Sequence, residues 1–360
     1  MAVKWGVLST ARVNRRFLAG ARLAADVEVV AIASSDRSSA ERYAREHGIE
    51  RAHGGYDALL ADPDVDVVYI SLPNSLHVDW TVRALESGKN VLCETPLGRR
   101  AVEVSTAFDV AEREGRLLME AYTYRHNPQT HRLTELTDQS AVGRVRLVRA
   151  ALVRAAFSFV PSHQANFRLS AALDGGTLMD FGCYCVNGAR LIAGEPERVN
   201  AEQVIGGDGV DIEFTATMHF AGDVLAQCHA GLAAAARQEL EVVGDQGSLL
   251  LDDPWRCRRP GIEIRRSDGV ERIEIEPVDS YGLEVENMSA AVRGEAPLLL
   301  SRDDAIGQAR AIEALYESAD TEHAVALNRN PHTPVGRRQI KADVRLDNDS
   351  GGGRLLRSLW

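Results

Sequence analysis

The sequence has few of the features that would place it outside ordinary soluble proteins. Its five cysteines are odd in number and scattered over 360 residues, so we expect thiols in a reducing cytoplasm and no disulfide framework. No apolar run approaches the roughly 20 residues that a membrane span needs. The chain enters an expected strand at once, and we therefore expect neither a signal peptide nor a membrane segment.

Positive charge in excess and metal-ligand spacing are missing as well. The formal net charge of -11 argues against nucleic acid and anionic membranes as partners. Cys183 and Cys185 lack a second pair of ligands, so they favour a packing role and no metal is expected. A hydrophobic content of 45% and a length of 360 residues are typical of a globular chain with two domains.

Residues 4–37 indicate a βαβ unit. A short apolar strand enters a turn of small residues, a helix follows over residues 15–24, and the segment VEVVAIA forms a second strand. This length is typical of a dinucleotide-binding half-fold, in which the helix N-terminus offers backbone N–H groups to a pyrophosphate. The glycines of the usual fingerprint would fall at Ser9, Ala11 and Asn14, and Asn14 departs from it. From this segment alone, an ordinary βαβ unit without cofactor stays open.

The end of the second strand bears on the type of cofactor. A free ribose 2′-hydroxyl usually meets an acidic residue there, but the register of the next helix places Ser34 at this position. Ser34 and Ser35 can donate hydrogen bonds, and Arg37 could meet a 2′-phosphate. These residues favour NADP. Asp36 leaves NAD open, because a small shift of register would let it bind the ribose.

Strands and helices alternate over residues 1–124 and predict a doubly wound parallel sheet, an α/β Rossmann domain. Ligands of such folds bind outside the carboxyl ends of the strands. Beyond residue 143 the pattern predicts strands over 144–157, 210–220 and 223–235, and a hairpin over 261–277. Helices are expected near 177–193, 283–292 and 302–318. We expect an α+β domain over 125–327 with an open, mainly antiparallel sheet, and a weakly ordered tail over 328–360. Arg144, Arg146, Arg149 and Arg154 are expected on one solvated face of the first strand.

Five motifs together resemble the glucose–fructose oxidoreductase/inositol dehydrogenase (Gfo/Idh/MocA) family. They are WGVLSTARVN, SLPNSLH, NVLCETPL, MEAYTYRHNP, and the segment from NFRL to AGEP. The chain is most similar to the branch of dihydrodiol dehydrogenases, NADP-dependent sugar dehydrogenases and glucose–fructose oxidoreductase. The resemblance covers roughly residues 3–325 and implies hydride transfer between a nicotinamide and a sugar or polyol hydroxyl. It also implies oligomer contacts through the open sheet, as a homodimer or homotetramer.

The resemblance implies a set of site residues. Asp180 and Tyr184 match the family's D-x-G-x-Y motif on one face of a helix start, where Tyr184 would carry the proton if nearby charge lowers its pKa. A helix N-terminal carboxylate and a half-buried core aromatic are the structural alternatives for these two residues. Tyr122 and Arg168 would join them in binding substrate. The cofactor would contact Ser9, Thr10, Ala11, Arg12, Val13, Ser34, Ser35, Arg37, Leu72, Pro73, Asn74, His77, Glu94, Thr95 and Arg125.

One position departs from the family. The usual Glu-Lys-Pro motif is Glu94-Thr95-Pro96 here. A threonine hydroxyl can form a hydrogen bond, but it is no base near neutral pH and brings no positive charge. Thr95 is therefore a third catalytic candidate and leaves two alternatives beside simple dehydrogenation. One is a sugar-modifying reaction without net redox change, and the other is a nucleotide-binding protein with altered catalysis.

Overall fold

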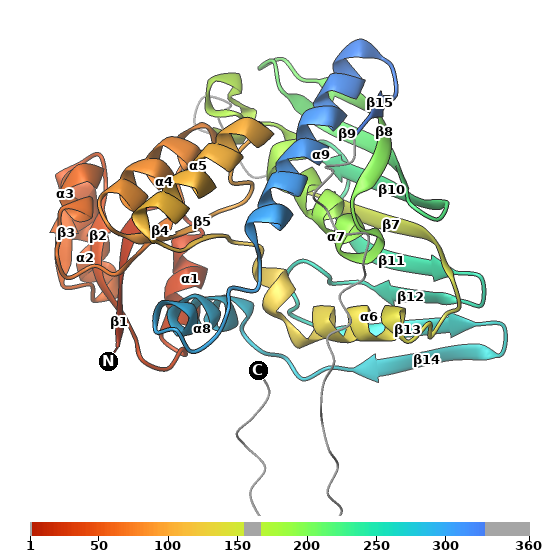
Figure 1. Cartoon of the computed structure of the whole chain (residues 1–360), viewed down its shortest axis with the longest axis horizontal. Coiled ribbons are helices and arrows are strands. Elements are labelled where there is room, and N and C mark those ends of the chain that lie inside the picture. Colours follow the sequence, from red (N-terminus) through yellow and green to blue (C-terminus); the bar gives the residue numbers. More distant parts are fainter. Residues whose placement is uncertain (1, 155–166, 328–360) are drawn as a thin grey trace, which may run out of the picture. The chain divides into compact units, whose positions relative to one another are not determined.

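The computed structural model describes residues 2–154 and 167–327 (Figure 1). The expected tail over 328–360 lies outside the described residues. Contacts among Cα atoms group residues 1–327 into one compact unit, so the expected boundary between residues 124 and 125 stays a prediction. In the described part of the chain, no helix is both long and apolar enough to cross a membrane.

The first sheet is parallel and has the strand order β3-β2-β1-β4-β5-β6. This is the order of a Rossmann fold, and the order reverses between β1 and β4, where such folds bind their ligands. Strand β4 is fully apolar and buried, and β1 is so except for the partly buried Lys4, as expected of strands covered on two faces. The six strands are β1 (Val3–Leu8), β2 (Val27–Ala33), β3 (Arg51–His53), β4 (Val67–Ile70), β5 (Asn90–Cys93) and β6 (Leu118–Glu120).

Helices connect these strands, close to the predicted positions. Gly48 and Gly115 end α2 and α5 in the left-handed conformation, with φ of 70° and 61°. The helices are α1 (Asn14–Ala21), α2 (Arg37–His47), α3 (Tyr56–Leu60), α4 (His77–Glu86) and α5 (Ala101–Glu114), with 3₁₀ turns at Asn74–Leu76 and Thr123–His126.

The second sheet has the order β14-β13-β12-β11-β7-β10-β9-β8-β15 and is antiparallel except for the pair of β7 and β10. The predicted strands appear as β7 (Val145–Val153), β9 (Asp211–Phe220), β10 (Val224–Gly231), β13 (Gly261–Arg266) and β14 (Gly269–Glu274). The sequence reading missed the other strands and one helix, α6 (Pro128–Asp138). These strands are β8 (Pro196–Ile205), β11 (Arg237–Gly244), β12 (Ser248–Leu251) and β15 (Val325–Ala326). The fold class is therefore confirmed, a Rossmann sheet followed by an open, mainly antiparallel one.

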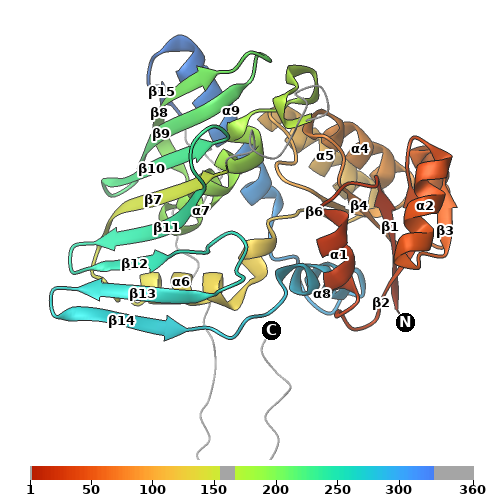
Figure 2. The ribbon, with the colours of Figure 1, turned by 180° about the vertical axis from the view of Figure 1, so that it is seen from behind.

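Helices α6, α7 (Cys183–Ala193) and α9 (Arg302–Thr321) lie on one face of the larger sheet, and Figure 2 shows the opposite face. Two late helices also pack against the Rossmann half. Helix α8 (Ser280–Val292) packs on α1, and α9 packs on α5. Trp5 in β1 donates an indole hydrogen bond to Ser289 Oγ in α8 at 3.2 Å. These contacts hold the carboxyl ends of the Rossmann strands beside α7.

Candidate active site

The turn after β1 is narrow and internally braced. Ser9 has a φ of 108°, a conformation that favours glycine. Its hydroxyl accepts a hydrogen bond from the Ala11 N–H at 3.1 Å and lies 2.8 Å from the Ser71 hydroxyl. The turn therefore brings small residues to the start of α1, as the sequence predicts.

Asn14 replaces the third fingerprint glycine with a polar brace. It is fully buried, and its amide donates to the Ser9 carbonyl at 2.7 Å. The Ser71 hydroxyl donates to Asn14 Oδ1 at 2.6 Å. Hydrogen bonds thus fasten the start of α1 to the ends of β1 and β4, where a glycine would allow only close packing.

The end of β2 carries serines without a free carboxylate beside them. Asp36 caps α2, where its carboxylate accepts from the N–H groups of Ser38 and Ser39. Hydrogen bonds from the side chains of Ser39 and Ser38, followed by those from the backbone, hold its pKa at about 2. Ser34 is buried, and the Arg37 guanidinium pairs with Glu41 at 2.9 Å. An open pocket of about 180 Å³ follows between α1 and α2, lined by Thr10, Ala11, Arg12, Arg15, Ser39, Arg42, Tyr43 and Glu46. The sequence reading missed Ser39 and Arg42, although they share one turn of α2.

The side chains of two predicted residues, His77 and Asn74, brace the loops that follow β4 and β5. His77 is buried, and its two ring nitrogens lie 2.8 Å from the carbonyls of Leu72 and Pro96. Asn74 follows Pro73 and donates its amide to the Asp174 carbonyl at 2.9 Å. These contacts hold the loop after β4 against both the loop after β5 and residues of the second half.

The loop after β5 presents Thr95 to Tyr184. The Thr95–Pro96 bond is cis, and Thr95 Oγ1 donates to the Tyr184 hydroxyl at 3.2 Å. The neighbouring Glu94 accepts a short hydrogen bond from the Tyr69 hydroxyl. Burial raises the pKa of Glu94. Two of the predicted catalytic residues, 89 positions apart, therefore touch.

Tyr184 lies in an aromatic setting. Its ring is 5.4 Å from that of Tyr122 and 6.1 Å from that of Trp255. Burial raises the pKa of Tyr184 well above its usual value, the nearby Glu94 and Tyr281 raise it further, and the Thr95 hydrogen bond acts in the opposite direction. The expectation of a lowered pKa is thus not met in this arrangement, because burial and the nearby negative groups outweigh the hydrogen bond from Thr95.

Asp180 lies in a single π-helical turn, Leu178–Gly182, that leads into α7, and Tyr184 follows in the first turn of α7. Such turns occur often at functional sites. The Arg168 Nε lies 3.5 Å from Asp180 Oδ2, and that oxygen is buried without a hydrogen bond among the described residues. Burial raises the pKa of Asp180 to about 6, although Arg168 lowers it.

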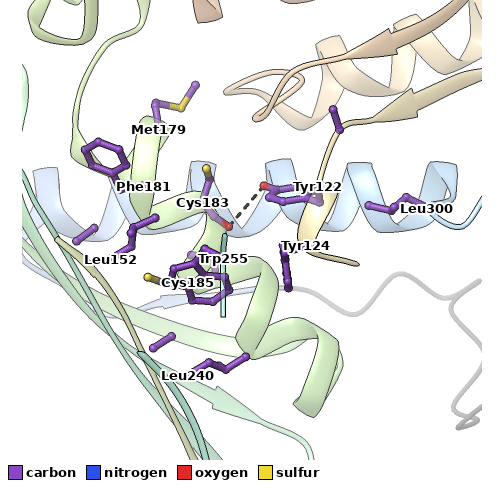
Figure 3. Close-up of a cluster of buried hydrophobic side chains, with 14 of the residues drawn as sticks. Tyr122, Tyr124, Leu152, Met179, Phe181, Cys183, Cys185, Leu240, Trp255 and Leu300 are labelled. Carbon is purple, nitrogen blue, oxygen red and sulfur yellow. Dashed lines mark hydrogen bonds between the residues drawn. The ribbon is translucent and has the colours of Figure 1, made fainter. Parts of the chain in front are cut away.

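Two other predicted residues have contacts of their own. Tyr122 is buried, and its hydroxyl points at the Cys183 carbonyl at 3.5 Å, as the dashed line in Figure 3 shows. The Arg125 guanidinium pairs with Asp304 at 3.1 Å and with Asn187 at 3.3 Å. Tyr122 therefore supports the Tyr184 ring, while Arg125 ties the first half to α9.

A buried acid fastens the site loop. Glu120 ends β6, is 2% exposed and accepts a hydrogen bond from the Leu97 N–H at 2.8 Å. Burial raises its pKa to about 8. The sequence reading missed Glu120 because it lies within an otherwise apolar strand.

Arginine residues were also missed or misplaced. Arg146 and Arg149 are exposed in β7, and Arg144 is exposed just before this strand begins. Arg154 is not on this solvated face, because β7 ends at Val153 and the guanidinium turns over the Phe181 ring, 5.4 Å from its centroid. Arg256 follows Trp255 in a loop, and no sequence motif pointed to it. The described residues contain no group of three or more side chains that could hold a metal ion.

Comparison with known proteins gives consistent results over both halves. Residues 3–122 match the model described as "Oxidoreductase family, NAD-binding Rossmann fold", and residues 130–250 match the GFO/IDH/MocA C-terminal domain. The chain is 38% identical over 330 residues to D-xylose 1-dehydrogenase (NADP(+)) 2 of Haloferax volcanii, covering 90% of this chain and 99% of the relative.

Two further matches differ in the named substrate. The trans-1,2-dihydrobenzene-1,2-diol dehydrogenase of Danio rerio is 34% identical, covering 71% of this chain and 76% of the relative. A crystal structure of a 3-ketoreductase from Actinomadura kijaniata, in complex with NADP and TDP-benzene, has a TM-score of 0.82 at 30% identity. It covers 88% of this chain and 98% of that chain.

Proposed function

This chain belongs to the GFO/IDH/MocA family of oxidoreductases, and from this premise we propose that it is an NADP-dependent oxidoreductase of sugars, polyols or related cyclic alcohols. A xylose dehydrogenase and a 3-ketoreductase among the similar proteins support this substrate class. The single observation that carries the proposal is the contact between Thr95 and Tyr184, because it joins the cofactor half to the substrate half at a group that can exchange a proton.

The residues at the strand ends fit a dinucleotide phosphate. The turn at Ser9 has a positive φ and leads into a helix N-terminus, which attracts a pyrophosphate. At the end of β2 the carboxylate of Asp36 is taken up by capping α2. Arg12, Arg15 and Arg42 line the nearby pocket together with Ser39, and Glu46 is the carboxylate among its lining residues. This arrangement favours a 2′-phosphate over a free ribose hydroxyl. The bound nicotinamide would supply or accept the hydride.

Tyr184 would hold the proton that moves with the reaction. Because its pKa is raised, the phenol is protonated near neutral pH and is ready to donate to an oxygen that gains negative charge. Thr95 orients that hydroxyl through the 3.2 Å hydrogen bond. Asp180, with a pKa of about 6, would accept a hydrogen bond from a substrate hydroxyl above that pH. The site in this state favours carbonyl reduction.

The test follows the absorbance of reduced nicotinamide with NADPH or NADH and a panel of sugars and keto-sugars. We expect turnover with NADPH and at least a hundredfold loss of kcat in Tyr184→Phe, since general acid catalysis contributes about 10²–10⁴-fold. Tyr124→Phe is the matched control, because its hydroxyl lies in the same aromatic cluster but donates to Asn187. Tight NADPH binding without turnover of any sugar would contradict the proposal, and product analysis would then reveal a reaction without net redox change.

The proposal extends to assembly as a homodimer or homotetramer through the outer face of the larger sheet. That face carries short polar side chains over three adjacent strands, among them Thr215, Thr217 and Gln227. In the described part of the chain no helix covers it, as Figure 2 shows. Light scattering on a sizing column tests this, and a monomer at micromolar concentration would contradict it.

A further inference from the structure

Arg154 lies over the turn that carries the catalytic candidates. Its backbone N–H donates to the Gly231 carbonyl at 2.8 Å, which fixes the residue at the end of β7. Its guanidinium lies 5.4 Å from the centroid of Phe181, the residue after Asp180. It also interacts electrostatically with the Tyr184 hydroxyl. Arg154 therefore faces the reacting group from the substrate half.

Arg256 approaches the same place from another element. It follows Trp255, whose ring is 6.1 Å from that of Tyr184. Its Nε is buried and has no hydrogen-bond partner among the described residues. Within that part of the chain, neither Arg154 nor Arg256 forms an ion pair with a carboxylate. Half-buried guanidinium groups that lack a carboxylate partner among the described residues are costly unless an anion binds them.

The nearby acids form no ion pair with these arginines among the described residues, although the charge of Asp253 raises the pKa of Arg256. Burial lowers the pKa of Arg154 to about 10, and Arg256 and Arg168 lower it further by repulsion. Glu94 already accepts a hydrogen bond from the Tyr69 hydroxyl. Asp180 is in addition already paired with Arg168. Arg154 is therefore repelled by two other guanidinium groups, those of Arg256 and Arg168, on the substrate side of Tyr184.

The phosphates of the cofactor do not account for these two arginines. A pyrophosphate would bind at the turn from Ser9 to Val13, at the start of α1. Arg154 and Arg256 come instead from the larger sheet and the loop before β13. A third guanidinium, that of Arg16 in α1, interacts with both of them. Arg16 differs from them because it lies on the helix that follows the phosphate turn and is hydrogen-bonded to Tyr281.

We propose that the substrate carries an anionic group, a carboxylate or a phosphate, which Arg154 and Arg256 bind beside the carbon that reacts at Tyr184. The inference rests on the proposed function, because it concerns the substrate of the same site. Guanidinium forks match both kinds of anion, and charge-assisted hydrogen bonds of this type are strong and specific. Neutral sugars would leave the two guanidinium groups unpaired.

The experiment compares matched substrates that differ only in charge. Initial rates with NADPH or NADP are measured for a neutral sugar, the corresponding uronic acid, the sugar monophosphate and the nucleoside diphosphate sugar. We expect at least a tenfold preference in kcat/KM for one of the charged forms. The form that is preferred tells whether the group is a carboxylate, a phosphate or a diphosphate. Equal or better kcat/KM for the neutral sugar would overturn the inference and leave the proposed function intact.

Variants then assign the effect to the two arginines. Arg154→Gln and Arg256→Gln should each raise KM for the charged substrate by about 10–100-fold, the value of a charge-assisted hydrogen bond. Arg154→Lys should restore part of the loss. Arg146→Gln is the control, since it removes the same charge from the exposed face of β7. The dissociation constant of NADPH should not change in any of these variants. An unchanged KM in both glutamine variants would refute the assignment.

A binding measurement separates this inference from the proposed function. Calorimetric titration of the protein–NADPH complex with the same four compounds needs no turnover. Binding of an anionic sugar that is lost in Arg154→Gln supports the inference even if no reaction is seen. Failure of every anionic sugar to bind overturns it. Failure of NADPH itself to bind would instead contradict the proposed function.

Discussion

Substitution of Glu120 by glutamine gives the sharpest physical test of the site loop. Glu120 is fully enclosed and its oxygen accepts the Leu97 N–H, which ends the loop bearing Thr95. Burial is the largest cause of its raised pKa of about 8, Asp304 raises it further, and Arg190 acts in the opposite direction. Glutamine keeps the acceptor oxygen and cannot ionise.

The magnitude follows from the two pKa values. Between pH 4.5 and about 8 the folded protein keeps a proton on Glu120 that the unfolded chain releases, so the free energy of unfolding falls as pH rises. At about 1.36 kcal/mol per pH unit, this costs roughly 3 kcal/mol at pH 7 and about 1 kcal/mol at pH 5. Relative to the Glu120→Gln variant, the wild type should therefore lose about 2 kcal/mol between these two pH values.

Urea unfolding followed by tryptophan fluorescence at pH 5 and pH 7 measures this difference. The exposed Glu276→Gln is the control, and its curves should run parallel to those of the wild type. Parallel behaviour of Glu120→Gln itself would refute the reasoning. It would mean that Glu120 is ionised in the folded protein and is stabilised there by Arg190 and Arg125.

Three further predictions concern the site directly. Asn14→Ala removes the amide that donates to the buried Ser9 carbonyl, while the Ser71 hydroxyl can still donate to the Leu8 carbonyl; it should lower the free energy of unfolding by about 1–3 kcal/mol, measured by urea unfolding. Unchanged stability would show that water replaces the amide. Asp180→Asn should remove a limb near pH 6 from the pH profile of kcat/KM, and a profile that keeps this limb would exclude Asp180 as its source. Thr95→Lys brings an ammonium group near the Tyr184 hydroxyl and should lower its pKa by about 2–3 units, which favours alcohol oxidation at neutral pH. Spectrophotometric titration of the phenol measures that shift, and an unshifted phenol would contradict it.

The Rossmann half was predictable because its strands are buried on both faces and read as continuous apolar runs, as VVYI in β4 shows. The second half was harder. Strand β11 reads RQELEVVG, and its charged side chains point to the outer face of the sheet, which hides the strand among loop-like residues. Helix α6 has polar side chains over most of its length and depends on contacts with distant residues, such as the bond from Gln129 to Asp253.

Some residues of the site were likewise predictable from the sequence, and others were not. The resemblance to a known family predicted Asp180, Tyr184 and Thr95 as one site, and the structure brings Thr95 and Tyr184 into contact. No local sequence signal could reveal Arg256, because it lies in an irregular loop and comes near Tyr184 only in the folded chain. Arg154 was misplaced because alternation along a strand predicts a face only as far as the strand continues, and β7 ends one residue earlier. Its side chain direction depends on where the sheet stops.

The packing of α8 and α9 on the Rossmann half has a consequence for how the protein is made. Helix α1 stays uncovered until the ribosome has synthesised α8, which ends at Val292. The face of α5 that packs against α9 stays exposed until synthesis reaches Thr321. Trp5, among the first residues to be synthesised, finds its partner Ser289 only after some 284 more have followed. A nascent chain that has emerged up to β6 therefore carries exposed apolar surface, and folding of the nucleotide-binding half should complete late in synthesis rather than one half at a time.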